Sequence, residues 1–401
     1  MSKNKGPQRS GRGNHGRQQS RRRPQNNNKR RGAYIHPSKF IKQASPVKQT
    51  PEYKAERKFS DFPFNKILHR NISEKGYETP SMIQDQAIPP IIDGKDIVGL
   101  ANTGTGKTAA FLLPIIDQLY FTKNTLSVFI LAPTRELAQQ IDEQFRVFSR
   151  DMKLYSTLLV GGTNIGRQIS QLRRQPHVVI ATPGRALDLV KRKALKLNFV
   201  DTLVLDEADR MLDMGFINDI RTLTKQTAED RQTLFFSATM TDQIKKLTKE
   251  FLNDPEVISV RTADTSDNVD QNVVKASTKE EKIEKLLSML NEEEFKKVLL
   301  FGETKYGVQR LSDKLNEKGI DSVAIHGNKS QSQRQTALKS FKNDKSRVMV
   351  ATDVAARGLD VPNVSHVINF DQPATYEDYV HRIGRTGRGG ATGKALTFIE
   401  K

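Results

Sequence analysis

Residues 101–108 read A-N-T-G-T-G-K-T. An apolar run at residues 96–100 precedes this stretch, and an apolar segment with helical character follows it at residues 109–116. A strand, a glycine-rich turn and a helix in this order direct backbone N–H groups and the positive end of a helix toward an anion. The pattern predicts a nucleotide-phosphate loop in which Lys107 reaches the β- and γ-phosphates and the Thr108 hydroxyl holds Mg²⁺.

The loop pattern G-x-x-x-x-G-K-[ST] has glycine where this chain has alanine, so the match is relaxed at its first position. The two glycines inside the loop still allow the backbone to turn around a phosphate. A structural turn is the alternative interpretation. The residues expected to contact the nucleotide in this loop are Ala101, Asn102, Thr103, Gly104, Thr105, Gly106, Lys107 and Thr108.

Composition limits the possible classes of protein. The chain has 401 residues, which suggests two or three domains, and 36% of them are hydrophobic. Because there is no cysteine, disulfides, thiolate metal sites and cysteine nucleophiles are excluded. No apolar run is long enough to span a membrane, and the basic N-terminus lacks the apolar core of a secretory signal. We therefore expect a soluble cytoplasmic protein, and a nuclear address in the basic tail is the open alternative.

The net charge of +19 is concentrated at one end of the chain. Residues 1–58 contain 17 Lys and Arg but only 2 Asp and Glu, a net charge of +15, and the remainder carries only +4. A Gly-, Arg-, Gln- and Asn-rich tail with few large apolar side chains predicts disorder. Such an arm is expected to bind a polyanion, such as RNA, by releasing counterions, or else to act as a solubilising tail. A small apolar island at residues 34–40 is expected to dock either on the folded body or on a partner.

Apolar runs alternate with helical stretches from residue 59 onward, which is typical of a doubly wound α/β fold with buried parallel strands. We expect domain 1 at residues 59–260, a polar hinge at 261–270 and domain 2 at 271–401. Helices are expected at 136–148, 240–251, 280–290 and 307–318. The predicted strands are 97–101, 128–132, 156–160, 178–181, 203–205, 233–236, 257–260, 273–276, 298–301, 322–325, 348–351, 366–370 and 395–399.

A second motif, L-V-L-D-E-A-D at residues 203–209, places two adjacent carboxylates after an apolar strand. Asp206 would hold Mg²⁺, and Glu207 would orient and deprotonate the attacking water. A solvated acidic turn is the alternative. The position of the motif, about a hundred residues after the phosphate loop, favours a nucleoside-triphosphatase site.

Together, D-E-A-D and A-N-T-G-T-G-K-T resemble the DEAD-box ATP-dependent RNA helicases, and the resemblance extends from residue 59 to the C-terminus. It implies two tandem RecA-like α/β domains that bind ATP and Mg²⁺. Residues 59–87 resemble the adenine-reading Q motif, with G-Y-E-T-P-S-M-I-Q at 76–84. By this resemblance Gln84 reads the adenine edge, Tyr77 packs on its ring, and Phe59 is the upstream aromatic residue. A helix-capping loop with a buried tyrosine is the alternative.

Three further motifs each follow a predicted strand, namely P-T-R-E-L-A at 133–138, G-G at 161–162 and T-P-G-R at 182–185. They should meet at the carboxyl edge of the sheet, where α/β proteins bind ligands. Their charges, hydroxyls and backbone N–H groups suit a sugar–phosphate backbone, although each motif alone is also a helix cap or turn. The resemblance assigns to single-stranded RNA Pro133, Thr134, Arg135, Gly162, Thr182, Gly184 and Arg185.

The resemblance also implies how hydrolysis is coupled to strand separation. Ser237 and Thr239, in S-A-T, are expected to bond Asp209, with helix capping as the alternative or additional role. In H-R-I-G-R-T-G-R, at residues 381–388, the resemblance makes Arg385 and Arg388 arginine fingers for the γ-phosphate. The same motif carries His381, which is expected to link the two domains by hydrogen bonding rather than to act as a base. A basic surface turn is the alternative for this motif.

Motifs in the second domain complete the set. By resemblance Thr304 in F-G-E-T and Thr352 in A-T-D-V-A-A-R-G-L-D contact RNA, and Asp360 approaches the ribose of the nucleotide. The family more often has an apolar residue where this chain has Gly302. Arg334 is expected to contact RNA or to brace the domain.

These residues predict an RNA-stimulated ATPase whose two domains close over ATP and RNA, bend one strand and unwind short duplexes with little sequence preference. One alternative is an ATP-gated RNA clamp or annealing chaperone. The other is a DNA-directed helicase of the same superfamily, because no residue in the sequence identifies the 2′-hydroxyl.

Overall fold

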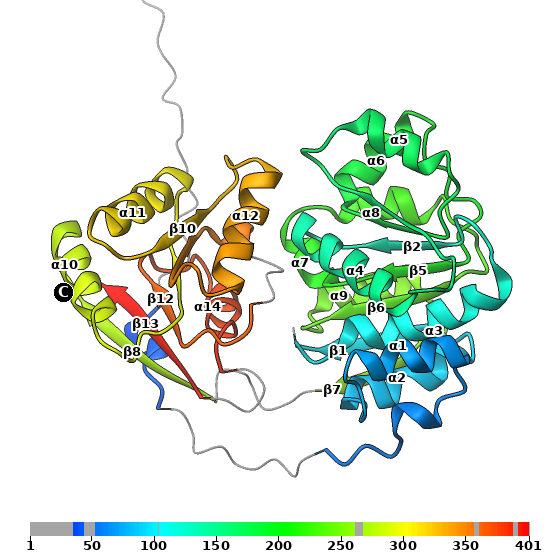
Figure 1. Ribbon diagram of the computed structural model, residues 1–401, viewed down its shortest axis with the longest axis horizontal. Coiled ribbons are helices and arrows are strands. Elements are labelled where there is room, and N and C mark those ends of the chain that lie inside the picture. The colour runs from blue at the N-terminus through cyan, green and yellow to red at the C-terminus, as the bar shows by residue number, and fades with distance from the viewer. Residues whose placement is uncertain are drawn as a thin grey trace, which may run out of the picture. The chain divides into compact units, whose positions relative to one another are not determined.

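The computed structural model describes residues 35–43, 53–102, 104–260, 268–356, 361–387 and 392–400. These residues form two α/β domains, each built on a parallel sheet with helices packed against it (Figure 1). The expected doubly wound RecA-like fold is confirmed. No helix in the described ranges combines the length and the apolar character that a bilayer span requires.

The first domain contains a seven-stranded parallel sheet in the order β3-β4-β2-β5-β6-β1-β7. Both faces of this sheet are buried because side chains alternate along each strand. In β2, Val128 and Ile130 pack on one face while Phe129 and Leu131 pack on the other. The strands are β1 (Ile97–Ala101), β2 (Val128–Leu131), β3 (Ser156–Leu159), β4 (Val178–Ala181), β5 (Thr202–Leu205), β6 (Gln232–Ser237) and β7 (Glu256–Val260).

The second domain contains a six-stranded parallel sheet in the order β10-β11-β9-β12-β13-β8. Its central strands are apolar and fully buried, as a parallel sheet covered on both faces requires. The strands are β8 (Val269–Lys275), β9 (Val298–Phe301), β10 (Ser322–Ile325), β11 (Val348–Ala351), β12 (His366–Asn369) and β13 (Gly393–Ile399).

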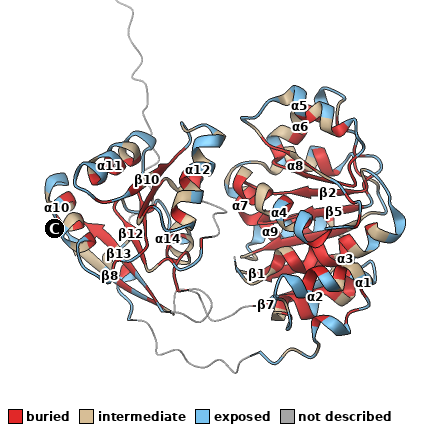
Figure 2. Cartoon of the chain, viewed as in Figure 1, coloured by how far each residue is buried: buried red, intermediate tan, exposed pale blue. Residues whose placement is uncertain are grey.

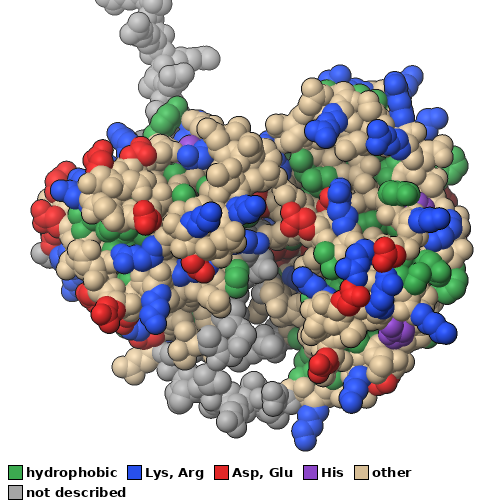
Figure 3. Space-filling model, viewed as in Figure 1, with side chains coloured by type: hydrophobic (Ala, Val, Ile, Leu, Met, Phe, Trp, Pro, Cys, Tyr) green, Lys and Arg blue, Asp and Glu red, His purple; other side chains and the backbone are tan. Residues whose placement is uncertain are grey.

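The helices bury one face against a sheet and expose the other, as Figure 2 shows. Basic and acidic side chains are interspersed on the face in view in Figure 3, which agrees with the low net charge expected beyond the tail. The helices of the first domain are α1 (Lys66–Glu74), α2 (Met82–Ile92), α3 (Lys107–Thr122), α4 (Arg135–Phe148), α5 (Ile165–Leu172), α6 (Pro183–Lys191), α7 (Ala208–Asp213), α8 (Ile217–Thr224) and α9 (Asp242–Phe251). Those of the second are α10 (Lys279–Leu290), α11 (Lys305–Glu317), α12 (Gln331–Lys342), α13 (Asp353–Ala356) and α14 (Tyr376–Ile383).

The strand predictions hold to within a residue or two except at β8. This strand begins at Val269, so the last two residues of the predicted hinge are part of a strand. β8 is an outer strand of its sheet, in which Val269 and Gln271 are buried and alternate with the exposed Asp270 and Asn272. Such alternation lacks the continuous apolar run by which the other strands were predicted. Residues 261–267 of the predicted hinge lie outside the described residues.

The predicted disordered tail, residues 1–58, is wrong for two described segments. Residues 35–43 contain a 3₁₀ turn, η1 (Pro37–Phe40), and Phe40 is completely buried against the second domain. Residues 53–58 contact α2, where Tyr53 donates a hydrogen bond to Asp85 and Arg57 forms an ion pair with it. The apolar island predicted at residues 34–40 thus docks on the folded body, one of the two outcomes expected for it, whereas the composition gave no indication of the contacts made by residues 53–58. Residues 1–34 and 44–52 lie outside the described residues.

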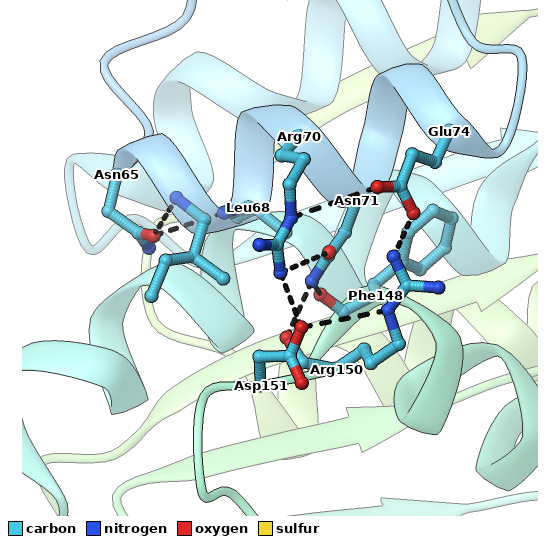
Figure 4. A network of polar contacts seen from close by, with 9 residues as sticks. Asn65, Leu68, Arg70, Asn71, Glu74, Phe148, Arg150 and Asp151 are labelled. Atoms are coloured by element: carbon cyan, nitrogen blue, oxygen red, sulfur yellow. Dashed lines mark hydrogen bonds and ion pairs between the residues drawn. The ribbon is translucent and has the colours of Figure 1, made fainter.

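A polar network fastens α1 to the end of α4 (Figure 4). Asn71 of α1 is buried, and its side-chain amide donates to the carbonyl oxygens of Phe148 and Arg150, both at 2.8 Å. Arg70 on the same helix forms an exposed ion pair with Asp151 at 2.6 Å. The buried amide supplies hydrogen bonds to two backbone carbonyl oxygens at the C-terminal end of α4, where no further helical turn can do so. The Arg70–Asp151 ion pair, by contrast, is exposed to solvent.

We expect Asn71→Ala to lower the free energy of unfolding of the first domain by about 2–4 kcal/mol, because two hydrogen bonds are lost and buried carbonyls remain unpaired. Urea unfolding followed by circular dichroism measures this change. Arg70→Ala is the matched control and should cost less than about 1 kcal/mol, because its ion pair is exposed. Equal losses in the two variants would contradict the assignment of the stability to the buried amide.

Candidate active site

The phosphate loop joins β1 to α3, as predicted. Gly104 (φ 91°) and Gly106 (φ 96°) adopt the left-handed conformation that other residues rarely tolerate. Lys107 is the first residue of α3 and is buried, and its Nζ donates to the carbonyl oxygen of Ala101 at 2.7 Å. Thr105 Oγ1 donates to the carbonyl oxygen of Asn102 at 2.8 Å. The loop therefore presents the N-terminus of a 16-residue helix, the geometry that attracts a phosphate. Thr103 lies outside the described residues.

The start of α2 braces this loop. Ser81 Oγ donates to the carbonyl oxygen of Thr105 at 2.7 Å, and Gln84 Nε2 donates to that of Gly106 at 3.1 Å. Gln84 Oε1 also accepts from the Ser81 backbone N–H at 2.8 Å, which forms a capping box. A Cβ at Gly106 would collide with the Gln84 amide, so this position has no room for a side chain. The helix-cap interpretation of Gln84 is confirmed, and its reading of adenine stays a prediction.

Aromatic side chains pack beside the braced loop. The Phe59 ring lies 5.7 Å from the Tyr77 ring, and Tyr77 meets Phe148 edge-on with centroids 5.8 Å apart. Phe59 is buried, while Tyr77 is half-buried and lines a cavity of about 180 Å³. Lys107 and Thr108 line the same cavity. The predicted adenine side and the phosphate loop therefore share one pocket.

The D-E-A-D motif reaches this cavity from the end of β5. Asp206 is buried, and its Oδ1 accepts from the Glu207 backbone N–H at 3.0 Å. Glu207 has a left-handed backbone (φ 51°) at the start of α7. A non-glycine residue in this conformation stores strain, which is common at functional sites. Both carboxylates line the cavity with Lys107 and Thr108.

Burial raises the pKa of Asp206 to about 6, and the nearby Lys107 ammonium opposes this rise. The carboxylate is therefore still mainly ionised at neutral pH, which suits a residue that contacts a cation. A buried carboxylate beside a threonine hydroxyl is an oxygen donor set suited to Mg²⁺, which the protein usually holds through few ligands and several waters. Thr108 and Asp206 thus fit the magnesium role predicted for them.

The S-A-T segment, at the end of β6, contacts Asp209. Thr239 Oγ1 lies 3.4 Å from Asp209 Oδ2, which also accepts from the Ala238 backbone N–H at 3.1 Å. Ser237 differs from the prediction, because its hydroxyl donates to the carbonyl oxygen of Thr239 at 2.8 Å instead. The cap of α9 is Thr241, so capping is not the role of Ser237 or Thr239. One hydroxyl rather than two therefore connects this segment to the D-E-A-D motif.

The three predicted RNA motifs of the first domain follow β2, β3 and β4, which are neighbours in the sheet. Gly162 (φ 75°) lies so close to the Arg135 guanidinium that a Cβ there would collide with it. Thr134 caps α4 by accepting from the Leu137 N–H at 3.2 Å. Arg135 and Gly162, 27 positions apart in sequence, are thus brought into contact at the carboxyl edge.

The third motif is held by α5. Arg185 Nη1 donates to Gln168 Oε1 at 2.8 Å and to the carbonyl oxygen of Thr163 at 3.3 Å. Thr182 occupies the N-cap position of α6 but makes no side-chain cap bond, Pro183 is the first helical residue, and Gly184 has open space around its α-carbon. Pro133 precedes the cap of α4. The seven residues assigned to RNA in this domain are therefore clustered on three adjacent strand ends.

In the second domain Thr304 follows β9 and Thr352 follows the neighbouring strand β11. Thr304 caps α11 by accepting from the Gly307 N–H at 3.0 Å. Arg334 of α12 is nearly buried, and its guanidinium lies 2.8 Å from Glu136 Oε1. Glu136 belongs to α4 of the first domain, so this ion pair does not test the bracing of the second domain, and both roles expected for Arg334 stay predictions.

The arginine-finger motif begins in α14. Arg385 is buried and lines a small cavity with Arg210, Asp353 and His381, whereas the residues that line the Lys107 cavity all belong to the first domain. Burial is the main cause that lowers the pKa of His381 to about 4, with Arg210 acting in the same direction and Asp209 opposing both. His381 is therefore neutral near pH 7, where one ring nitrogen can donate and the other can accept a hydrogen bond, and its predicted linking role stays a prediction. Arg388 and Asp360 lie outside the described residues.

Known protein families match both domains. Residues 81–247 match the family model "DEAD/DEAH box helicase", and residues 278–390 match "Helicase conserved C-terminal domain". The chain is 42% identical over 342 residues to the DEAD-box ATP-dependent RNA helicase CshA of Bacillus subtilis, an alignment that covers 85% of this chain and 69% of that protein. The chain belongs to the DEAD-box family of ATP-dependent RNA helicases.

A second relative of this helicase is the ATP-dependent RNA helicase CshA of Listeria monocytogenes, which is 45% identical over 344 residues. That alignment covers 86% of this chain but 66% of the relative. The helicase thus spans about two thirds of the length of these curated relatives. Among solved structures it is similar to Mss116p bound to single-stranded RNA and AMP-PNP, with a TM-score of 0.77, 33% identity and coverage of 88% of this chain and 77% of the other.

Saccharomyces cerevisiae Dbp5 bound to RNA and ADP BeF3 is similar as well, with a TM-score of 0.76 and 29% identity. The match covers 86% of this chain and 89% of that one. The expected DEAD-box family, fold and ATP-dependent RNA helicase class are therefore confirmed for the helicase. Its individual site residues are supported by geometry alone.

Sequence reasoning missed several residues that hold the site of the helicase together. Ser81 had a signal, because S-x-x-Q is a capping-box pattern. Gln168, which holds Arg185, had none, since it lies in an ordinary amphipathic helix. The Arg382–Asp353 pair, at 2.6 Å, had none either, because its two partners come from separate helices.

Proposed function

We propose that the helicase hydrolyses ATP in the cavity around Lys107, Asp206 and Glu207 when RNA is bound, and that the two domains close during this reaction to separate short RNA duplexes. The convergence of these three side chains on one cavity beside a helix N-terminus carries the proposal. The solved relatives support the RNA part, because the similar structures of Mss116p and Dbp5 both contain bound RNA.

Each residue of the cavity has a distinct task in this proposal. Lys107 and the loop N–H groups bind the β- and γ-phosphates, and Glu207 orients a water and accepts its proton. Mg²⁺, held by Thr108 and Asp206, would neutralise the developing phosphate charge. A side chain of the protein must accept the proton of the attacking water, and we assign this task to the Glu207 carboxylate.

Adenine recognition is proposed for Gln84, Tyr77 and Phe59. The Gln84 amide donates to the carbonyl oxygen of Gly106 and accepts from the Ser81 N–H, so it is in direct contact with the phosphate loop. A bound base would take one donor and one acceptor from this amide, and Tyr77 would cover one face of its ring. Base recognition and the shape of the phosphate loop are coupled through a single side chain.

RNA binding is proposed at the strand-end cluster of the first domain together with Thr304 and Thr352. Arginine forks, threonine hydroxyls and glycine N–H groups contact phosphate and ribose without reading bases, which predicts little sequence preference. Domain closure would bring Arg385 and Arg388 to the γ-phosphate and exclude water from it. Because the fingers come from the second domain, hydrolysis would require closure.

We expect single-stranded RNA to raise the ATPase rate by at least about tenfold, which is about 1.4 kcal/mol of activation free energy, and DNA of the same sequence to raise it less. The measurement is steady-state phosphate release with matched RNA and DNA oligonucleotides, alongside strand displacement and strand annealing assays. Equal stimulation by DNA would indicate a DNA-directed helicase. Annealing without displacement would indicate a clamp or annealing chaperone.

A further inference from the structure

The segment 35–43 is docked on the second domain through one fully buried aromatic residue. Phe40 packs in an apolar cluster with Tyr379 and Ile383 of α14 and with Val269 of β8. Its ring centroid lies 4.8 Å from that of Tyr379, which is also completely buried. The segment therefore covers apolar surface of α14 that would otherwise face solvent.

Backbone pairing fixes the register of this segment. Lys42 and Gln271 exchange two backbone hydrogen bonds, at 3.0 and 2.7 Å, which form an antiparallel bridge to the outer strand β8. The Gln271 side chain continues the connection, because its Oε1 accepts from the Tyr379 hydroxyl at 3.0 Å. One strand residue thus joins the docked segment to α14.

The rest of α14 is held from inside the domain. Arg382 donates to both oxygens of Asp353, at 2.6 and 2.7 Å, and to the carbonyl oxygen of Asp371 at 2.7 Å. α14 ends at Ile383, a member of the Phe40 cluster, and Arg385 follows two positions later. The Arg385 backbone N–H donates to the Arg382 carbonyl oxygen at 3.1 Å. A change in the position of α14 therefore also changes the position of the arginine-finger motif, which begins in this helix.

We propose that Phe40 is a positioning residue for ATP hydrolysis: by packing on Tyr379 and Ile383, it fixes the C-terminal end of α14 and thereby the approach of Arg385 to the γ-phosphate. This inference rests on the proposed finger role of Arg385. It assigns a part in the reaction to the apolar island at residues 34–40, which the sequence predicted to dock without indicating a function for it. The effect is one of orientation, since Phe40 belongs to a cluster that does not include the residues of the ATP cavity.

The inference predicts a change in kcat rather than in substrate affinity. We expect Phe40→Ala to lower the RNA-stimulated kcat by about tenfold to a hundredfold, the range that a misplacement of about 1 Å can cause. The KM for ATP should change by less than about twofold, because the groups that bind ATP before closure belong to the first domain. Phe40→Leu, which keeps apolar volume in the cluster, should restore most of the kcat. Ile41→Ala, at the exposed neighbour, is the matched control and should behave as the parent chain.

The full chain is used throughout, and each variant is assayed below its own melting temperature, measured by circular dichroism. If Phe40→Ala does not fold, Phe40→Val replaces it, because this smaller change still removes the ring contact with Tyr379. A lowered kcat at an unchanged melting temperature supports the inference. A parental kcat, or a rise in KM alone, overturns it. Arg385→Ala is measured in parallel: if it leaves kcat unchanged, the finger role itself fails, whereas loss in Arg385→Ala alone defeats only the role of Phe40.

Discussion

Glu207→Gln is expected to lower the RNA-stimulated rate of ATP hydrolysis by about 10²–10⁴-fold, the usual contribution of a general base. The amide has nearly the shape of the carboxylate but cannot accept the proton of the attacking water. Glu207 lines the same cavity as Lys107, and its backbone is held in a left-handed conformation that directs the side chain from the start of α7. Phosphate release under saturating ATP and RNA measures the change.

ATP affinity should be retained in this variant, because Lys107 and the loop N–H groups are untouched. Binding of a fluorescent ATP analogue tests this separately from turnover. Glu250→Gln makes the same chemical change at an exposed carboxylate of α9 that pairs with Arg221, and it should leave the rate unaltered. An unreduced RNA-stimulated rate in Glu207→Gln would reject the role of this residue as the base.

The fold could be predicted because the central strands are buried on both faces. Runs such as Val348–Ala351 contain only apolar residues, so their boundaries follow from hydrophobicity alone. β8 was predicted too short because the first half of this outer strand contains three consecutive polar residues, Asp270, Gln271 and Asn272, and no apolar run. The apolar island at residues 34–40 was expected to dock on the folded body or on a partner, and it docks on the body through Phe40. The surface that receives it could not be predicted, because no periodicity in the sequence links that surface to Phe40. Its partners, Tyr379 and Val269, are more than two hundred residues away.

For the candidate site, likewise, some features could be predicted from the sequence and others could not. Lys107, Asp206 and Glu207 follow strands that the sequence locates well, so their convergence could be foreseen from sheet topology. Contacts between side chains could not. Ser237 was expected to bond Asp209, but its hydroxyl instead reaches the Thr239 carbonyl oxygen. A serine hydroxyl can donate a hydrogen bond to any nearby acceptor in the turn. Which acceptor lies within reach depends on backbone angles that the sequence does not specify.

Arg385→Ala is expected to reduce RNA-stimulated turnover by about 10³–10⁵-fold, the contribution that an arginine finger makes to phosphoryl transfer. A planar guanidinium donates two parallel hydrogen bonds to phosphate oxygens as negative charge spreads over them. Arg385→Lys should recover only a small part of the rate, because a lysine ammonium supplies the charge without the fork. Single-turnover ATP hydrolysis with RNA bound isolates this step from product release.

The finger role also predicts what should not change. ATP and RNA should each bind the Arg385→Ala variant alone with parental affinity, since the guanidinium acts only when both domains contact one nucleotide. Arg310→Ala removes an exposed arginine from α11 of the same domain and serves as the control for lost positive charge. Equal losses in Arg310→Ala and Arg385→Ala would mean that general electrostatic attraction, rather than directed contact with the γ-phosphate, stimulates the reaction. A loss confined to Arg385, with ATP binding intact, requires the second domain to complete an active site that the first domain holds only in part.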